Sequence, residues 1–247
     1  MLNYALVQES TEAKAKAIQQ MFSEIAPRYD LLNRVLSAGV DRSWRTSAVR
    51  AALERSPRRV LDLATGTGDI ALLLKKVSPQ TEVVGADFAA PMLELARQKA
   101  QRAGLEVPFV QADALKLPFP DGAFDAVTIS FGFRNFADYE RSLRELHRVL
   151  SKRGRLCILE FPPPPRGGLG ALYRFYFTRV LPLIGGVISG SRSAYQYLPE
   201  SVSRFPSPDE LAHMMTRAGF HTQYQLFTGG IAALHVGDRT ELIHTLV

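Results

Sequence analysis

The sequence predicts an α/β fold, a doubly wound, seven-stranded, mainly parallel sheet. Three observations favour it. An apolar strand pattern at 59–63 runs through a glycine-containing loop into a helix pattern at 69–77. Strand and helix patterns then alternate through the middle of the chain, as in parallel sheets with crossover helices. Two last strand patterns, at 221–227 and 231–236, flank Gly229-Gly230 and predict an antiparallel hairpin.

The other elements follow from periodicity and from the residues that end them. Helices are expected at 11–26 and 42–54, where apolar residues recur at helical spacing and a proline follows each pattern. The remaining expected strands are 82–87, 107–111, 123–130 and 155–161, and the helices between them are 91–103 and 138–150. A helix at 207–218 is expected to be capped by Ser207 and closed by Gly219.

The length of 247 residues and a hydrophobic content of 46% suit one large domain. We expect four parts within it. They are an N-terminal helical segment on the substrate side (1–56), a cofactor-binding core (57–161), an aromatic-rich cap insertion (162–206), and a C-terminal helix with the hairpin (207–247). The cap begins at four prolines, which cannot continue a central strand.

The composition narrows the classes of function and the partners that are expected for this protein. The single Cys157 excludes an internal disulfide, and no apolar run reaches the roughly 18 residues of a membrane span. The N-terminus lacks a signal-peptide pattern, so a cytoplasmic enzyme is expected. The net charge of +6 comes from dispersed Lys and Arg, which indicates a solvated basic surface and no nucleic-acid partner. The five histidines lack the tight spacing of metal ligands, so no metal is expected.

The loop after the first strand of the alternation predicts a cofactor site. Gly66 and Gly68 allow a ligand to approach the backbone at the positive end of the next helix. Together with Ala71 they also satisfy the looser dinucleotide pattern, so a nicotinamide or flavin nucleotide stays open, as does a plain strand–turn–helix connection. Asp62, at the strand end, favours S-adenosylmethionine, because it could order the loop and face the cationic methionine end. The terminal hairpin favours the same cofactor and a class I methyltransferase fold.

The ends of the following strands carry further candidates, because ligands of open α/β sheets lie beyond the carboxyl ends of the strands. Asp87 could accept from both ribose hydroxyls, with a helix N-cap as the alternative. Asp113 could accept from the adenine amino group while the Ala114 N–H meets a ring nitrogen, and a simple turn is the alternative. Ser130 lies where it could line the pocket.

Arg134 and Asn135 follow the fourth strand, on the loop where an acceptor would face the methyl donor. An Arg could bind an anionic phenolate or lower the pKa of a bound hydroxyl, and an Asn could orient an oxygen. A surface Arg–Asn turn is the alternative.

Three segments resemble the C-methyltransferases of ubiquinone and menaquinone biosynthesis, the demethylmenaquinone methyltransferase type included. They are Phe22 to Asn33 with Trp44 at the front, Thr128 to Asn135 in the centre, and Arg148 to Phe161 at the rear. The resemblance runs from about residue 15 to 237, and the front and rear segments are more specific than the glycine loop. It implies cofactor contacts by Thr67, Asp87, Asp113 with Ala114, and Ser130.

The chain departs from the family pattern at several positions. Asp41 stands where the front segment often has His, which makes a His-based catalytic role there untenable. Lys152-Arg153-Gly154 replaces the usual Pro-Gly-Gly, and the serine expected after Glu160-Phe161-Pro162 is absent. None of these departures removes an implied cofactor contact.

The resemblance implies S-adenosylmethionine-dependent carbon methylation of a polyprenyl quinol ring, with demethylmenaquinol converted to menaquinol. Arg134 and Asn135 would assist the quinol oxygen, and Tyr29 and Asp30 would close the site. The benzoquinol precursor of ubiquinone is the alternative acceptor. Methylation of RNA or of a small molecule, a nucleotide-dependent oxidoreductase, and a non-catalytic assembly subunit also stay open.

The aromatic-rich span 169–205 would cover the isoprenoid tail or lie on the inner face of the cell membrane, where its arginines meet anionic headgroups. An ordinary helical cap on the sheet is the alternative. A homodimer is a further expectation.

Overall fold

The computed structural model describes residues 39–164 and 192–240. Their strands form one seven-stranded sheet in the order β3-β2-β1-β4-β5-β7-β6. The strands are β1 (Arg59–Leu63), β2 (Glu82–Asp87), β3 (Phe109–Gln111), β4 (Phe124–Ser130), β5 (Leu150–Glu160), β6 (Phe220–Phe227) and β7 (Ala232–Arg239). The predicted doubly wound, mainly parallel sheet is confirmed, and the helix expected at 11–26 lies outside the described residues.

The direction of the strands reverses only at β7. The pairs β3–β2, β2–β1, β1–β4 and β4–β5 are parallel, whereas β7 is antiparallel to both β5 and β6. Strand order reverses between β1 and β4, which is the switch point where ligands of such sheets bind. The short 3-10 turn η4 (Thr228–Gly230) joins β6 and β7 as the predicted hairpin.

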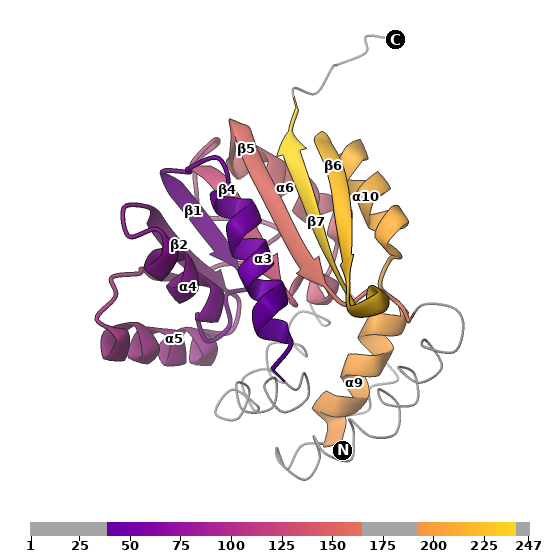
Figure 1. Ribbon diagram of the computed structural model, residues 1–247, viewed down its shortest axis with the longest axis horizontal. Helices are drawn as coiled ribbons and strands as arrows, with labels where there is room; N and C mark the ends of the chain where they lie inside the picture. Colours follow the sequence, from indigo (N-terminus) through magenta and orange to yellow (C-terminus); the bar gives the residue numbers. More distant parts are fainter. Residues whose placement is uncertain (1–38, 165–191, 241–247) are drawn as a thin grey trace.

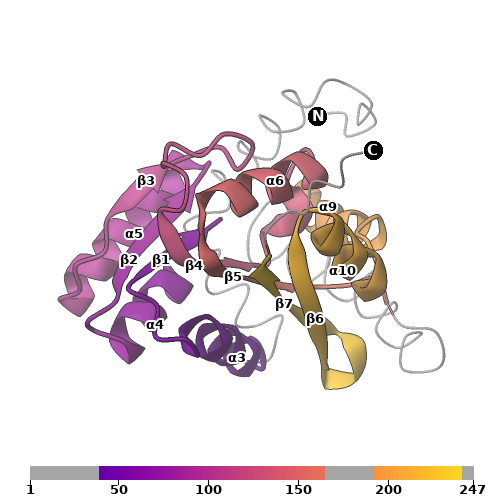
Figure 2. The same ribbon diagram turned by 90° about the horizontal axis from the view of Figure 1, so that it is seen from above.

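Helices cover both faces of the sheet (Figures 1 and 2). The described helices are α3 (Asp41–Leu53), α4 (Asp69–Val77), α5 (Ala90–Ala103), α6 (Tyr139–Val149), α9 (Arg192–Ser203) and α10 (Pro208–Arg217). Buried residues of α3, α4 and α5 pack on one face of the strands. Those of α6 and α10 pack on the other, and α9 lies beside the end of the sheet where β5 finishes.

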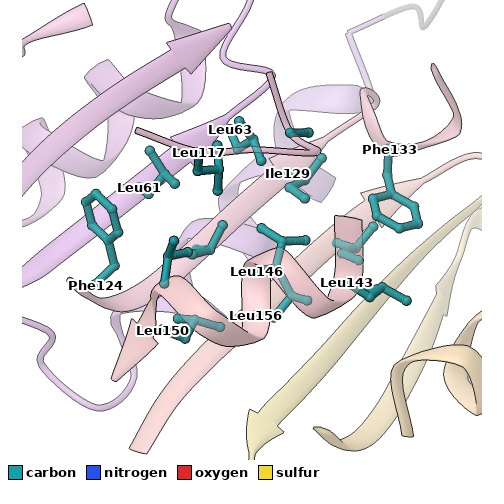
Figure 3. Packing of buried hydrophobic residues seen from close by; sticks show 14 of the residues in the cluster. Leu61, Leu63, Leu117, Phe124, Ile129, Phe133, Leu143, Leu146, Leu150 and Leu156 are labelled. Atoms are coloured by element: carbon teal, nitrogen blue, oxygen red, sulfur yellow. The ribbon is translucent and has the colours of Figure 1, made fainter. Parts of the chain in front are cut away.

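One of the two large clusters of the apolar core lies on the face of the sheet that α6 and α10 cover. Leu143 and Leu146 of α6 face Leu61 of β1 and Ile129 of β4, and all four side chains are fully buried (Figure 3). Burying large aliphatic side chains stabilises the fold by about 1.5–3 kcal/mol each. This packing holds β1 and β4 side by side, and their ends carry the candidate site.

Three strand boundaries differ from the prediction by more than one residue, each for a local reason. β3 begins at Phe109 and not at 107, because Pro108 has no N–H to extend the ladder. β5 begins at Leu150 and not at 155, since Leu150 pairs with Phe124 before polar residues 151–154 interrupt the register. β7 runs three residues beyond 236 because its pairing with β6 continues to Arg239.

Candidate functional site

A pocket that is partly open to solvent lies beyond the carboxyl ends of β1, β2 and β4. Most of the lining is apolar, including Leu63, Met92 and Phe136. Six predicted site residues also line it, namely Gly66, Asp87, Asp113, Ala114, Ser130 and Asn135. The structure therefore brings six of the ten predicted site residues that it describes into one cavity.

The two glycines of the loop after β1 have different structural roles. Both have left-handed backbone angles, with φ of 55° at Gly66 and 86° at Gly68, which favour glycine. Gly66 lines the pocket. Gly68 does not; it is the N-cap of α4, and a Cβ there would lie 3.0 Å from the Cβ of Ala96 on α5. Gly66 thus gives a ligand access to the backbone. Gly68 is required for the left-handed backbone angle before α4 and for the close packing against α5.

Asp62 holds this loop from behind. Its carboxylate is 1% exposed and accepts hydrogen bonds from the hydroxyls of Thr65 (2.6 Å) and Thr128 (2.8 Å). Thr128 lies opposite Asp62 in the β1–β4 register, so the carboxylate ties the loop to the next strand. Burial raises the pKa of Asp62 to about 6, although both hydroxyls and the charge of Arg45 act to lower it. The predicted ordering role is present, and Asp62 itself stays outside the pocket lining.

Asp87 joins the loop to the second strand. One carboxylate oxygen accepts from the backbone N–H of Gly66 (2.8 Å) and the other from that of Ala89 (2.9 Å). The Phe88 backbone N–H also acts on this carboxylate. Because a carboxylate has about four lone-pair sites in all, acceptor capacity is left for a ligand in the pocket. Burial raises the pKa of Asp87, and the backbone hydrogen bonds act against that rise. The N-cap of α5 is Ala89, so the alternative of Asp87 as that cap is wrong.

Ser130 and Asp113 lie on two sides of the same cavity. The Ser130 hydroxyl oxygen is buried and has no hydrogen-bond partner among the described residues, as expected of a group that meets a ligand. Asp113 accepts from the backbone N–H of Leu115 at 2.9 Å, so it does form the turn considered as its alternative. It still lines the pocket together with Ala114.

Thr67 lies behind the pocket lining. It is 3% exposed, and its hydroxyl accepts from the Lys99 ammonium group at 2.9 Å. Its contact with a cofactor stays a prediction.

The ends of β1 and β4 approach each other unusually closely. Ala64 and Phe131 both line the pocket and have positive φ angles of 55° and 59°, which cost L-residues of order 1–3 kcal/mol each. At the residue after Phe131, a Cβ added to Gly132 would lie 2.4 Å from the Cβ of Ala64. Only a glycine at position 132 lets the segments that follow β1 and β4 pack directly against each other beside the pocket.

Arg134 belongs to a buried ion pair next to this wall. It lies in the 3-10 turn η2 (Phe133–Asn135), and its Nη1 is 2.9 Å from Oε1 of Glu160 at the end of β5. The same Nη1 donates to the carbonyl of Phe131, and the Arg134 backbone N–H donates to the other Glu160 oxygen at 3.2 Å. Both side chains are almost fully buried, and Arg134 is not among the pocket-lining residues. Its contact with the acceptor stays a prediction.

Asn135, the next residue, does line the pocket. Its side-chain oxygen accepts from the hydroxyl of Tyr197 on α9 at 3.0 Å. Tyr29 and Asp30, the other predicted acceptor-side residues, lie outside the described residues.

Sequence reasoning missed two members of this region, Glu160 and Tyr197. Glu160 had a usable signal, because it is a carboxylate at the end of an apolar strand, as Asp62 and Asp87 are. Tyr197 had none, since it lies 62 residues from Asn135 in a cap insertion rich in aromatics.

Residues 39–164 and 192–240 contain neither a metal-binding cluster nor a membrane-spanning helix. No cluster of three or more His, Cys, Asp or Glu side chains there could hold a metal. No helix in that part of the chain has the length and apolar character needed to cross a membrane.

Comparison of the sequence with known proteins gives a consistent result. Residues 8–239 match the model of the ubiE/COQ5 methyltransferase family. A demethylmenaquinone methyltransferase of Thermus thermophilus is 67% identical, over 89% of this chain and 100% of that protein. A protein of the same name from Deinococcus radiodurans is 59% identical, over 92% of this chain and 94% of that protein.

Solved structures share the fold at much lower identity. A Thermotoga maritima structure described as a SAM-dependent methyltransferase superposes with a TM-score of 0.63 at 22% identity, covering 90% of this chain and 99% of that one. A cyclase superposes with a TM-score of 0.68 at 17% identity, covering 90% of this chain and 95% of that one. The fold is therefore that of S-adenosylmethionine-dependent methyltransferases, and this fold also supports other chemistry.

The raised pKa of Asp62 predicts how stability changes with pH. Because its folded-state pKa of about 6 exceeds the ordinary value of 3.8, the folded state holds the proton more tightly. This contribution is present at acidic pH and is lost as the pH rises through 6. Between pH 4.5 and 7.5, the free energy of unfolding of the wild type should fall by about 2 kcal/mol relative to Asp62→Asn. Urea unfolding of both proteins across this range measures the difference, and parallel curves would contradict the assignment.

Proposed function

The chain belongs to the ubiE/COQ5 methyltransferase family, and on that basis we propose that it methylates a ring carbon of a polyprenyl quinol, converting demethylmenaquinol to menaquinol. The observation that carries this proposal is the 67% identity, over the whole length of the relative, to a protein named demethylmenaquinone methyltransferase. The pocket at the β1–β4 switch point lies where ligands of such sheets bind. The reaction replaces a hydrogen on the quinol ring with a methyl group.

The residues present fit S-adenosylmethionine as the cofactor. Asp87 would hold the ribose hydroxyls, Asp113 and Ala114 the adenine, and the unpartnered Ser130 hydroxyl would meet a polar group of the ligand. When bound, the cofactor supplies an electrophilic methyl group on a positively charged sulfur. Asp62, ionised above its pKa of about 6, places negative charge behind the loop and favours that cation.

On the acceptor side, the chain must orient a quinol oxygen and exclude water from the reacting carbon. Asn135 presents an amide to the pocket, and the aromatic rings of Phe131 and Phe136 supply apolar walls. The buried pair of Arg134 and Glu160 fixes the turn that carries Asn135. We carry over from the family resemblance that Tyr29 and Asp30 close the site from the N-terminal segment.

The cofactor assignment predicts a specific loss of affinity. Asp87→Asn should weaken S-adenosylhomocysteine binding about 100-fold, because it removes charge-assisted hydrogen bonds to the ribose. Asp125→Asn is the matched control, since Asp125 also accepts two backbone N–H groups, those of Arg58 and Arg59, but at the opposite end of the sheet. Isothermal calorimetry should show near wild-type affinity for the control. Equal losses in the two variants would contradict the assigned ribose site.

The acceptor assignment is tested by turnover. Purified protein with S-adenosylmethionine should convert chemically reduced demethylmenaquinone to a product 14 mass units heavier, detected by mass spectrometry under anaerobic conditions. A demethylated benzoquinol precursor of ubiquinone is assayed in parallel. Turnover of the benzoquinol alone would select the alternative acceptor, and turnover of neither would refute quinol methylation.

We also propose peripheral contact with the cytoplasmic face of the membrane, supported by the lipid nature of a polyprenyl substrate and by the net charge of +6. The protein should float with liposomes containing phosphatidylglycerol at low salt and be released at high salt, because surface charges are screened. Protein that stays at the bottom of the gradient at low salt would refute membrane contact. The expected homodimer remains a separate proposal, supported only by the family resemblance.

A further inference from the structure

The side chain of Asn135 is hydrogen-bonded to Tyr197, which lies near the C-terminal end of the cap insertion (162–206). The Tyr197 hydroxyl lies 3.0 Å from Oδ1 of Asn135, which comes from a different element and lines the pocket. Tyr197 lies in the middle of α9, and α9 packs against the η2 turn that carries Asn135. This contact joins the cap insertion to the acceptor wall through side chains.

The direction of this hydrogen bond decides what Asn135 offers to a ligand. An amide has one acceptor oxygen and one donor nitrogen, on opposite branches of the side chain. The burial of Tyr197 raises its pKa to about 12, so the phenol keeps its proton and can donate it. With Oδ1 occupied by that proton, the Nδ2 group of Asn135 is the part left for a ligand.

We propose that Tyr197 is a positioning residue that orients the Asn135 amide so that its Nδ2–H donates to the quinol oxygen and favours the ionised hydroxyl. The inference rests on the proposed function and adds a residue and a direction to it. A hydrogen bond donated to a phenolate favours the charged form and lowers the pKa of the bound hydroxyl. The ionised oxygen releases electron density to the neighbouring ring carbon, which is the carbon that receives the methyl group.

Several charged or titratable groups lie around the contact between Tyr197 and Asn135. Arg134 on η2 and Glu160 on β5 form a buried ion pair, whose two charges largely offset each other. Arg204, just beyond α9, acts on Tyr197 as a cation, and Tyr139 on α6 lies close enough to interact with it. Asp87 and Asp113 lie on the cofactor side of the same pocket. Among these groups, only the Tyr197 hydroxyl is bonded to the Asn135 side chain in the described structure.

Tyr197→Phe tests this role, because it removes the hydroxyl and keeps the ring. At saturating cofactor and quinol, kcat should rise with pH as the bound hydroxyl ionises. In Tyr197→Phe this rise should move to higher pH by about one unit, a tenfold change in the ionisation constant, because the Asn135 amide is no longer held so that it donates to the charged oxygen. The affinity for S-adenosylhomocysteine should stay at the wild-type value, since the substitution is on the acceptor side.

Tyr139→Phe is the matched control. Its hydroxyl donates to the backbone carbonyl of Arg134 at 2.9 Å, and its ring stacks on Phe133, so it supports the same turn without touching the Asn135 amide. Its kcat profile should keep the wild-type pH midpoint, whatever it loses in thermal stability. Equal shifts in the two variants would mean a general loosening of the turn and would overturn the proposal.

A second variant keeps the test decisive if Tyr197→Phe fails to fold. Asn135→Asp retains an oxygen for Tyr197 but removes the amide donor, so it should shift the midpoint to higher pH at least as far and lower kcat about 100-fold. A wild-type midpoint in either Tyr197→Phe or Asn135→Asp overturns the inference. The wild type is assayed first, and its failure to methylate the quinol would refute the proposed function, whereas an unshifted variant beside an active wild type refutes only the role of Tyr197.

Discussion

The buried carboxylate of Asp62 is the contact on which the rest of the pocket depends. It receives one hydroxyl from the loop after β1 and another from the middle of β4, so it fixes the loop and spaces the two strands at once. Its removal from water is costly, and two short hydrogen bonds compensate part of that cost. Gly66 lies on this loop and donates to Asp87 at the end of β2, so the contact of Asp62 also helps to place the loop against β2.

The acceptor side is organised differently, around an ion pair. Arg134 and Glu160 are 6% and 1% exposed, and a buried pair of this kind is weak evidence for stability, since desolvation opposes the attraction. The ion pair instead fixes the position of the η2 turn. Glu160 receives both the guanidinium and the backbone N–H of Arg134, so the η2 turn has one position relative to β5. The strained backbone at Phe131 is retained beside it.

The sequence was most informative where structure is local. β1, β2 and α4 begin and end at the predicted residues, because their apolar runs are bounded by carboxylates and glycines. Pocket placement was predicted for Asp87, Ser130 and Asn135 because strand ends in a parallel sheet share one edge.

What sequence reasoning could not supply was the direction of side chains that depend on distant partners. Arg134 lies where it was expected along the chain, yet its guanidinium is paired with Glu160, 26 residues away. The two glycines of the loop look equivalent in sequence, but Gly68 is required by Ala96 and Phe109, which pack against it from other elements. Periodicity and motif spacing carry no information about such contacts.

The hydrogen bond between Tyr197 of α9 and Asn135 of η2 has an evolutionary consequence. The residues proposed to hold the cofactor come from the part of the chain that runs from β1 to the end of β4, whereas the cap reaches the pocket from an insertion between β5 and β6. The insertion can therefore accumulate substitutions that alter acceptor preference while the cofactor half stays intact. That separation offers a physical route by which one scaffold diversifies.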